Sequence, residues 1–287
     1  MIIRMYTKTR QLLEAIKFEH SVFALPFAYI GMVLAEQQLP DLGSFLWITC
    51  AMVSARTVAM TSNRIIDATI DFNNPRTRGR AIPAGILSKK ALAAMGIIAA
   101  VIFFIAAGML NPLCLALSPV ALVVVIGYSY SKRFTWMSHI ILGWADGIAP
   151  VGGWIGVRGT MDLEAVLLAG GVAAWIAGFD IIYSCQDVDF DKKNGLHSIP
   201  QRWGTRIALR ISRLFHLIAM VCFVSVGVWL GISWPYFLGL LIATGLMIYE
   251  HRLVKPEDLS KVNMAFFNVN GYISVVVMVC CLVAVYV

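Results

Sequence analysis

Residues 163–193 read LEAVLLAGGVAAWIAGFDIIYSCQDVDFDKK, and this stretch indicates the type of fold. Its first part, residues 163–183, is almost wholly apolar and has the length of about 20 residues that an α-helix needs to cross a bilayer. Polar sequence follows directly, with two carboxylates four positions apart at Asp187 and Asp191. The stretch therefore predicts a transmembrane helix that carries an acidic motif at one end.

The same apolar pattern recurs along the whole chain. Hydrophobic residues make up 59% of the 287 residues and only 14% are charged, well below the roughly 25% of a typical water-soluble domain. We therefore expect an all-α integral membrane protein with nine transmembrane helices, folded as a single domain over residues 1–287. The predicted spans are 21–38, 45–63, 91–110, 112–130, 137–157, 163–183, 211–231, 235–250 and 265–287.

Lys and Arg residues fall almost entirely on one side of this predicted topology. They cluster before the first segment and in the loops after the second, fourth, sixth and eighth segments, whereas the opposite side has only Arg158. Short loops rich in Lys and Arg stay in the cytoplasm, so we expect a cytoplasmic N-terminus and a location in the inner (plasma) membrane of a prokaryote. The net charge of +7 reflects these loops, and basic residues at helix ends beside lipid do not indicate a nucleic-acid partner.

Two inner loops carry related acidic motifs. Residues 63–83 read NRIIDATIDFNNPRTRGRAIP, and residues 186–200 read QDVDFDKKNGLHSIP. In each loop, two Asp residues four positions apart precede a basic, polar stretch that ends in Ile-Pro. The similarity indicates an internal duplication of a helical half. The four acidic residues are Asp67, Asp71, Asp187 and Asp191.

The spacing of these carboxylates indicates a site for a metal-bound diphosphate. Residues four apart lie on one face of a helix, so Asn63, Asp67 and Asp71 form one stripe. Asp187 and Asp191 form a second stripe for the same reason. Carboxylates this close together repel one another and are costly near lipid, so they need a cation. Mg²⁺ binds through one or two carboxylates and keeps places for water and phosphate oxygens. We therefore expect the four Asp residues to be catalytic Mg²⁺ ligands, with Asn63 nearby.

Basic residues on the same predicted side are candidates to contact the phosphate groups. Guanidinium and ammonium groups bind phosphate by charge-assisted hydrogen bonds. The candidates are Arg78 or Arg80 after the first motif, Lys132 and Arg133 after the fourth segment, and Lys192 or Lys193 after the second motif. The chain has no G-x-x-x-x-G-K-[ST], G-x-S-x-G or H-E-x-x-H motif, so nothing supports nucleotide hydrolysis, a serine nucleophile or zinc proteolysis.

The chain resembles a known family at these motifs. An Asn63-x₃-Asp67-x₃-Asp71 motif and an Asp187-x₃-Asp191 motif, on a chain with nine apolar segments, resemble those of the UbiA superfamily of intramembrane prenyltransferases. Two further segments are similar to family motifs, namely Tyr128-Ser-Tyr-Ser-Lys-Arg-Phe-Thr135 and Arg78-Gly-Arg-Ala-Ile-Pro83. The four matches occur in order and extend over essentially the full chain.

The resemblance implies a helical bundle around a central cavity, in which two Mg²⁺ bind an isoprenyl diphosphate between the acidic motifs. Ionisation would give an allylic carbocation, which the ring of a hydroxylated aromatic acid would attack. The partners would be polyprenyl diphosphate, the aromatic acceptor and membrane lipid, and the active site would face the cytoplasm. The residues implied in substrate binding are Asn63, Arg78, Arg80, Tyr128, Lys132, Arg133, Tyr183 and Lys192.

Within the superfamily, the chain looks most like a branch of 4-hydroxybenzoate polyprenyltransferases. This similarity lies in Phe18-Glu19-His20, Asn63-Arg64 and Asp180-x-x-Tyr183-x-x-Gln186-Asp187. It implies Mg²⁺-dependent polyprenyl transfer in ubiquinone biosynthesis. One alternative is prenylation of 1,4-dihydroxy-6-naphthoate in menaquinone biosynthesis, and another is a branch that farnesylates haem or esterifies chlorophyll-type acceptors. An alternative of another class is ion-coupled secondary transport, which predicts ion sites near the middle of the membrane.

Five ionisable residues have no assigned role from sequence. Glu19 and His20 stand where the family often has Arg before the first helix. Arg56, Asp146 and Asp180 lie inside predicted spans, where a charged group normally faces a cavity or an ionic partner. The sequence leaves open whether these three residues contribute to the acceptor site or to structural ion pairs.

Overall fold

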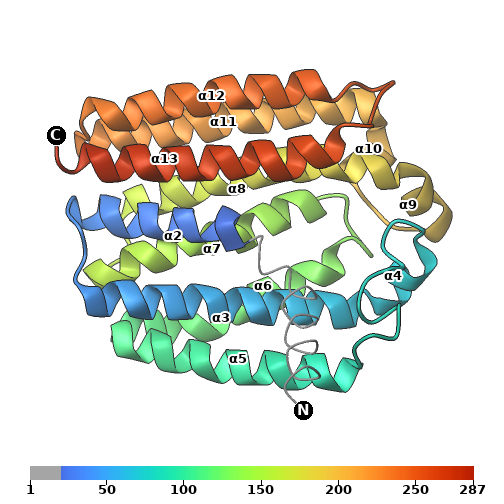
Figure 1. Ribbon diagram of the computed structural model, residues 1–287, viewed down its shortest axis with the longest axis horizontal. Helices are drawn as coiled ribbons and strands as arrows, with labels where there is room; N and C mark the ends of the chain where they lie inside the picture. The colour runs from blue at the N-terminus through green and yellow to red at the C-terminus, as the bar shows by residue number, and fades with distance from the viewer. Residues whose placement is uncertain (1–20) are drawn as a thin grey trace, which may run out of the picture.

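The computed structural model describes residues 21–287, and this part of the chain is helical and contains no strand (Figure 1). The expected all-α fold is therefore confirmed for these residues. The long helices are α2 (Ser21–Glu36), α3 (Leu42–Ile66), α5 (Lys89–Leu110), α6 (Pro112–Ser131), α7 (Ser138–Arg158), α8 (Leu163–Ser184), α11 (Thr205–Leu230), α12 (Trp234–Leu253) and α13 (Asn270–Ala284). The short elements are α4 (Ala68–Asn73), η2 (Cys185–Asp187), α9 (Val188–Asn194), α10 (Ile199–Trp203) and η3 (Met264–Val269).

Seven helical segments in the described part of the chain are long and apolar enough to cross a membrane. Each of them corresponds to one of the nine expected spans. The other two expected spans, 21–38 and 235–250, correspond to α2 and α12, which are not among the seven. The nine crossings and the cytoplasmic N-terminus therefore stay predictions. Glu19 and His20 lie outside the described residues.

Side-chain caps explain why several helices begin where they do. Asp41 accepts a hydrogen bond from the backbone nitrogen of Ser44 (3.0 Å) at the start of α3, and Ser88 accepts one from Ala91 (3.1 Å) at the start of α5. Each cap gives an acceptor to a backbone N–H that has no partner inside the helix. Polar residues between the apolar segments thus determine where these helices begin. The start of a helix in turn determines how far along the bundle each of its side chains lies.

The helices at the centre of the bundle approach one another closely through glycine. A Cβ atom at Gly153 of α7 would overlap the carbonyl oxygen of Ala28 in α2, and one at Gly31 of α2 would overlap that of Pro150 in α7. Small residues let membrane helices pack backbone against backbone. This contact holds α7 against α2 on one side, while α7 also packs along α8.

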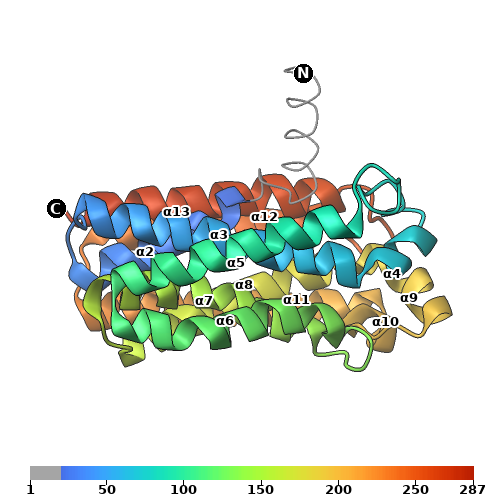
Figure 2. The same ribbon diagram turned by 90° about the horizontal axis from the view of Figure 1, so that it is seen from below.

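The two acidic loops meet at one end of the bundle. Figures 1 and 2 show α4, α9 and α10 together at this end, whereas the C-terminus lies at the opposite end. The helices that precede these elements, α3 and α8, run the length of the bundle and bring both motifs to the same level. The fold therefore assembles one site from two segments that are distant in sequence.

We predict that Gly153→Ala destabilises the protein, because the new methyl group would overlap the backbone of α2. Overpacking of this kind costs about 1–3 kcal/mol. Gly170→Ala in α8 is the matched control, because a Cβ atom there meets no atom within 4 Å and alanine favours a helix over glycine by about 1 kcal/mol. Thermal unfolding in detergent should show a lower midpoint for Gly153→Ala only. Equal midpoints for the two variants would contradict the close packing of α2 and α7.

Candidate active site

The first acidic motif lies where α3 passes into α4. α3 ends at Ile66, and Asp67 forms the junction between the two helices. The backbone nitrogen of Asp67 still donates to the carbonyl of Asn63 (2.8 Å), and that of Asp71 donates to Asp67 (2.8 Å). Because one-turn hydrogen bonds continue through the junction, the three polar side chains follow one another at helical spacing.

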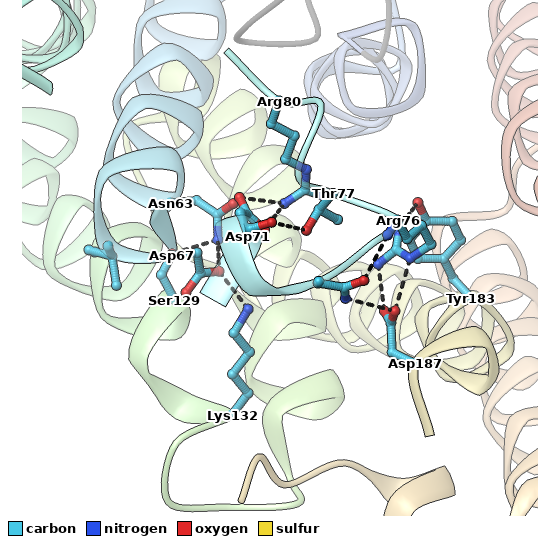
Figure 3. A network of polar contacts seen from close by, with 12 residues as sticks. Asn63, Asp67, Asp71, Arg76, Thr77, Arg80, Ser129, Lys132, Tyr183 and Asp187 are labelled. Carbon is cyan, nitrogen blue, oxygen red and sulfur yellow. Dashed lines mark hydrogen bonds and ion pairs between the residues drawn. The ribbon is translucent and has the colours of Figure 1, made fainter. Parts of the chain in front are cut away.

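Asp67 accepts hydrogen bonds from three different side chains, and Figure 3 shows two of these partners, Asn63 and Lys132. Lys132 Nζ lies 2.6 Å from Asp67 Oδ2, and Arg133 Nη2 lies 2.9 Å from Oδ1. Asn63 Nδ2 also donates to Asp67 Oδ2, at 3.0 Å. The Asp67 side chain is only 2% exposed, so these donors supply the hydrogen bonds that water would give to an exposed carboxylate.

Asp71 is held by the loop that follows α4. Arg80 Nη1 lies 2.7 and 2.9 Å from the two carboxylate oxygens of Asp71. Thr77 Oγ1 donates to the backbone carbonyl of Asp71 (3.2 Å) and fixes the loop beside the motif. The basic stretch after the first motif therefore folds back onto that motif.

The second acidic motif lies where α8 ends and the chain passes through η2 into α9. Asp187 accepts hydrogen bonds from Arg76 Nε (2.9 Å) and Asn74 Nδ2 (3.1 Å), both in the loop of the first motif. Arg76 Nη1 also donates to the hydroxyl of Tyr183 (2.7 Å), as Figure 3 shows. Burial alone would lower the pKa of the Arg76 guanidinium, but its hydrogen bond to Asp187 and the charge of that carboxylate outweigh burial, so the pKa is raised. Arg76 therefore stays charged and joins the two loops.

Asp191 has a different environment from the other three carboxylates. Ser198 Oγ donates to Asp191 Oδ2 (2.9 Å), and no basic side chain of the described residues forms an ion pair with Asp191. The side chain is half-buried. Asp191 is therefore the acidic residue of the site that is most available to a cation from outside.

The structure places the remaining expected site residues in three ways. Arg80, Lys132 and Arg133 belong to the ion-pair cluster described above. Arg78 and Lys192 are exposed, and within residues 21–287 neither side chain forms a hydrogen bond or ion pair. Tyr128 lines a cavity next to the cluster, and Tyr183 holds Arg76.

The residues at this end of the bundle fit Mg²⁺ that enters together with a phosphate ligand. Among the described residues, no three acidic, His or Cys side chains converge tightly enough to bind a metal on their own. The carboxylates are oxygen donors, however, and one or two of them suffice for each Mg²⁺ when phosphate oxygens and water complete its coordination. Basic side chains neutralise three of the carboxylates in this structure.

A cavity of about 430 Å³ lies next to the cluster, and most of its lining is apolar. It runs between α2, α3, α5, α6, α7 and α8 and reaches Phe266 of η3. The ionisable side chains in its wall are Arg56, Cys114, Tyr128, Asp146 and Asp180. Arg56 Nε is buried and makes no hydrogen bond within the described chain. A buried guanidinium nitrogen without a partner favours binding of an anionic group in the cavity.

The main site residues that sequence analysis missed are Arg76, Asn74 and Ser198. Arg76 and Asn74 belong to the same polar loop as the expected Arg78 and Arg80, but spacing alone does not show which side chain turns toward the second motif. Ser198 lies just before Ile-Pro in the second loop, and its position as the N-cap of α10 is a signal that could have drawn attention to it.

The fold and the paired acidic motifs define a class of helical membrane protein with a polar site above an apolar cavity. Residues 24–272 match the model of the UbiA prenyltransferase family. The chain therefore belongs to this family and is an integral membrane prenyltransferase, a class of enzyme and not of ion-coupled transporter.

Named relatives and solved structures agree with this assignment. The chain is 31% identical over 244 residues to the 4-hydroxybenzoate octaprenyltransferase of Shewanella halifaxensis, covering 84% of each protein. It is 29% identical to that of Vibrio cholerae serotype O1 over 86% of each protein. The apo structure of a UbiA homologue from Aeropyrum pernix has 30% identity and a TM-score of 0.85 over 92% of this chain and 98% of that one. A UbiA homologue from Archaeoglobus fulgidus, solved with GPP and Mg²⁺, has the same fold, with 16% identity and a TM-score of 0.71 over 96% of this chain and 100% of that one.

Proposed function

We propose that the protein transfers a polyprenyl group from polyprenyl diphosphate to 4-hydroxybenzoate in ubiquinone biosynthesis, in a Mg²⁺-dependent reaction. The observation that carries the proposal is the position of the two acidic motifs and their basic partners beside an apolar cavity, whose wall includes Arg56 with an Nε atom that makes no hydrogen bond among the described residues. The names of the relatives support this acceptor.

The charged cluster is suited to bind the diphosphate of the donor. When bound, Mg²⁺ would neutralise the diphosphate and favour its departure. The residues that would hold it are Asp67, Asp71, Asp187 and Asp191, with Asn63 nearby. The ligands of the Archaeoglobus fulgidus homologue, GPP and Mg²⁺, support this part of the proposal.

The basic side chains of the cluster would also bind the diphosphate. Phosphate oxygens can replace carboxylate oxygens as their hydrogen-bond acceptors. Arg80, Lys132 and Arg133 already lie beside the carboxylates and would bind phosphate as the carboxylates bind the metal. Arg78 and Lys192, which are exposed at the same end, would add contacts at the rim.

The cavity is suited to hold the apolar chain of the donor and to exclude water from the reaction. Loss of diphosphate leaves a positive charge on the first prenyl carbon, and aromatic faces stabilise such a charge. Tyr128 lines the cavity, and the ring of Tyr183 packs against Phe266, which also lines it, with a centroid distance of 4.2 Å. These two tyrosines would lie where the cation forms.

Arg56 would bind the carboxylate of the acceptor. It lies seven residues before Asn63 on α3, which is about 10.5 Å deeper in the bundle. An aromatic acid held there would point its ring toward the diphosphate site. Once the bond to diphosphate has broken, the ring carbon would bond to the cationic prenyl carbon, and loss of the ring proton would restore aromaticity. 1,4-Dihydroxy-6-naphthoate, of menaquinone biosynthesis, also has a carboxylate and is the second acceptor to test.

The arrangement of the chain in the membrane follows from the same features. We infer one domain over residues 1–287, nine crossings, and an N-terminus and active site on the cytoplasmic side of the inner membrane of a prokaryote. The basic loops beside both acidic motifs support this orientation, as does the position of the C-terminus at the other end of the bundle (Figure 1).

We predict that Asp67→Ala and Asp191→Ala each abolish prenyl transfer, because each removes a proposed metal ligand. Metal ions stabilise the transition state by several kcal/mol, so the rate of product formation should fall at least about 100-fold. Asp189→Ala is the matched control, since Asp189 belongs to the same motif but is exposed; it should stay within about threefold of the wild type. Product formation is measured by mass spectrometry on protein that has inserted normally. Full activity in either metal-ligand variant would rule out the proposed metal site.

A second prediction concerns the acceptor. Arg56→Gln should raise the KM for 4-hydroxybenzoate by about 10- to 100-fold, because it removes a charge-assisted interaction worth about 1.5–3 kcal/mol. The KM for the prenyl diphosphate should change much less. As a control, phenol lacks the carboxylate and should bind wild type and variant equally weakly. An equal rise in the KM of both substrates would show that Arg56 does not recognise the acceptor.

A further inference from the structure

His139 of α7 connects the cavity to the loop of the second acidic motif. It is only 3% exposed, and both nitrogens of its ring have partners. Nδ1 lies 2.6 Å from Asp180 Oδ2, and Nε2 lies 3.3 Å from the backbone nitrogen of Ile199. Since a backbone N–H can only donate, Nε2 is the acceptor and Nδ1 carries the proton donated to Asp180.

The Asp180 end of this connection faces the substrate cavity. Asp180 lines the same cavity as Arg56, and its side chain is 22% exposed. Asp180 belongs to α8, and the chain continues from it through the end of α8 and η2 to Asp187 of the second acidic motif. Because Arg56 and Asp180 line one cavity, a molecule bound at Arg56 would share that cavity with the Asp180 side chain.

The Ile199 end of the connection lies beside both acidic motifs. Ser198, the preceding residue, donates to Asp191 (2.9 Å) and accepts from the backbone nitrogen of Gln201 as the cap of α10 (3.2 Å). One residue earlier, the backbone nitrogen of His197 donates to the carbonyl of Lys132 (2.7 Å). Lys132 in turn binds Asp67. Residues 197–199 are therefore tied to a carboxylate of each motif.

We propose that His139 is a positioning residue that couples acceptor binding in the cavity to the geometry of the diphosphate site. The inference rests on the proposed function, because it takes the ligand beside Asp180 to be the aromatic acceptor. An acceptor that fixes Asp180 would fix the imidazole ring, and the ring would fix Ile199 and Ser198 and thus the carboxylate of Asp191. The donor would then bind in its reactive geometry chiefly when the acceptor is present.

Such coupling has a chemical use in this reaction. If the bond between prenyl carbon and diphosphate breaks without an acceptor, water adds to the carbocation, loses a proton and gives the prenyl alcohol and free diphosphate. If the acceptor is present, the ring carbon takes the cation instead. Coupling between two binding sites commonly amounts to a factor of about 5 to 150. A factor in this range would keep hydrolysis well below transfer.

Two substitutions of His139 each remove one of its two hydrogen bonds and keep the other. The amide nitrogen of His139→Asn occupies about the place of Nδ1 and can still donate to Asp180, but it does not reach Ile199. The amide oxygen of His139→Gln occupies about the place of Nε2 and can still accept from Ile199, but it loses Asp180. Each variant keeps one hydrogen bond and breaks the connection.

The matched control is His216→Gln. His216 is also a buried histidine of the bundle, with 4% exposure and its Nδ1 3.0 Å from Nε2 of His251. It does not line the cavity, and no hydrogen bond joins it to residues 197–199. Loss of a buried imidazole should therefore perturb packing in all three variants, whereas coupling should change only in the two His139 variants.

The experiment measures the affinity of the full-length protein for a nonreactive donor, geranyl S-thiolodiphosphate with Mg²⁺, with and without saturating 4-hydroxybenzoate. In the wild type and in His216→Gln, we expect 4-hydroxybenzoate to lower the Kd of the donor analogue at least about fivefold. In both His139 variants, the ratio of the Kd without 4-hydroxybenzoate to the Kd with it should fall to near one. The Kd of the analogue alone should stay within about threefold of the wild-type value. With a reactive donor, the ratio of prenyl alcohol to prenylated product should rise in the same two variants.

Two results would overturn the inference and leave the proposed function intact. One is a wild type that forms prenylated product but shows no effect of 4-hydroxybenzoate on the Kd of the analogue. The other is a His139→Asn or His139→Gln variant in which 4-hydroxybenzoate lowers the Kd of the analogue as much as it does in the wild type. The wild-type measurement tests the inference even if one variant does not fold. By contrast, a wild type that prenylates no acceptor and binds none would reject the proposed function itself.

Discussion

Charge compensation of buried carboxylates is the constraint on which the active-site end of this protein depends. Asp67 and Asp71 are almost inaccessible to solvent, and an ionised carboxyl group in such a place requires a partner. Lys132 and Arg80 supply it, and Arg76 does the same for Asp187 across the two loops. These ion pairs join the α3–α4 junction to the end of α6, and the loop after α4 to α4 itself and to η2. They set the mutual position of the two acidic motifs beside the cavity.

The same pairs connect stability to function. A cluster that is already compensated can accept a negatively charged diphosphate only if positive charge arrives with it, which is why the proposed Mg²⁺ and the donor would bind together. Basic side chains would then exchange carboxylate oxygens for phosphate oxygens. Asp191 differs from the other carboxylates, because among the described residues its carboxylate accepts a side-chain hydrogen bond only from Ser198. The proposed link through His139 acts on Asp191.

The sequence predicts the helices and the acidic motifs well, because both depend on local patterns. Apolar length gives the helices, polar caps give several of their ends, and a spacing of four residues gives the Asn63–Asp67–Asp71 stripe. The sequence could not predict that Arg76 contacts Asp187. The two residues are 111 positions apart, and their contact depends on the conformation of the loop that follows Pro75. Nor could the sequence show that Arg56 has an unpaired nitrogen in a cavity or that His139 links Asp180 to Ile199, because each depends on how separate helices pack.

In the proposed reaction, the paired acidic motifs catalyse metal-dependent transfer of a prenyl group to an aromatic acid. The most direct test incubates the purified protein in lipid with Mg²⁺, a polyprenyl diphosphate and either 4-hydroxybenzoate or 1,4-dihydroxy-6-naphthoate, and analyses the products by mass spectrometry. We expect prenylated 4-hydroxybenzoate, and we expect its formation to stop when a chelator is added. Absence of product with both acceptors, or product formation that persists in the presence of chelator, would contradict the proposed reaction.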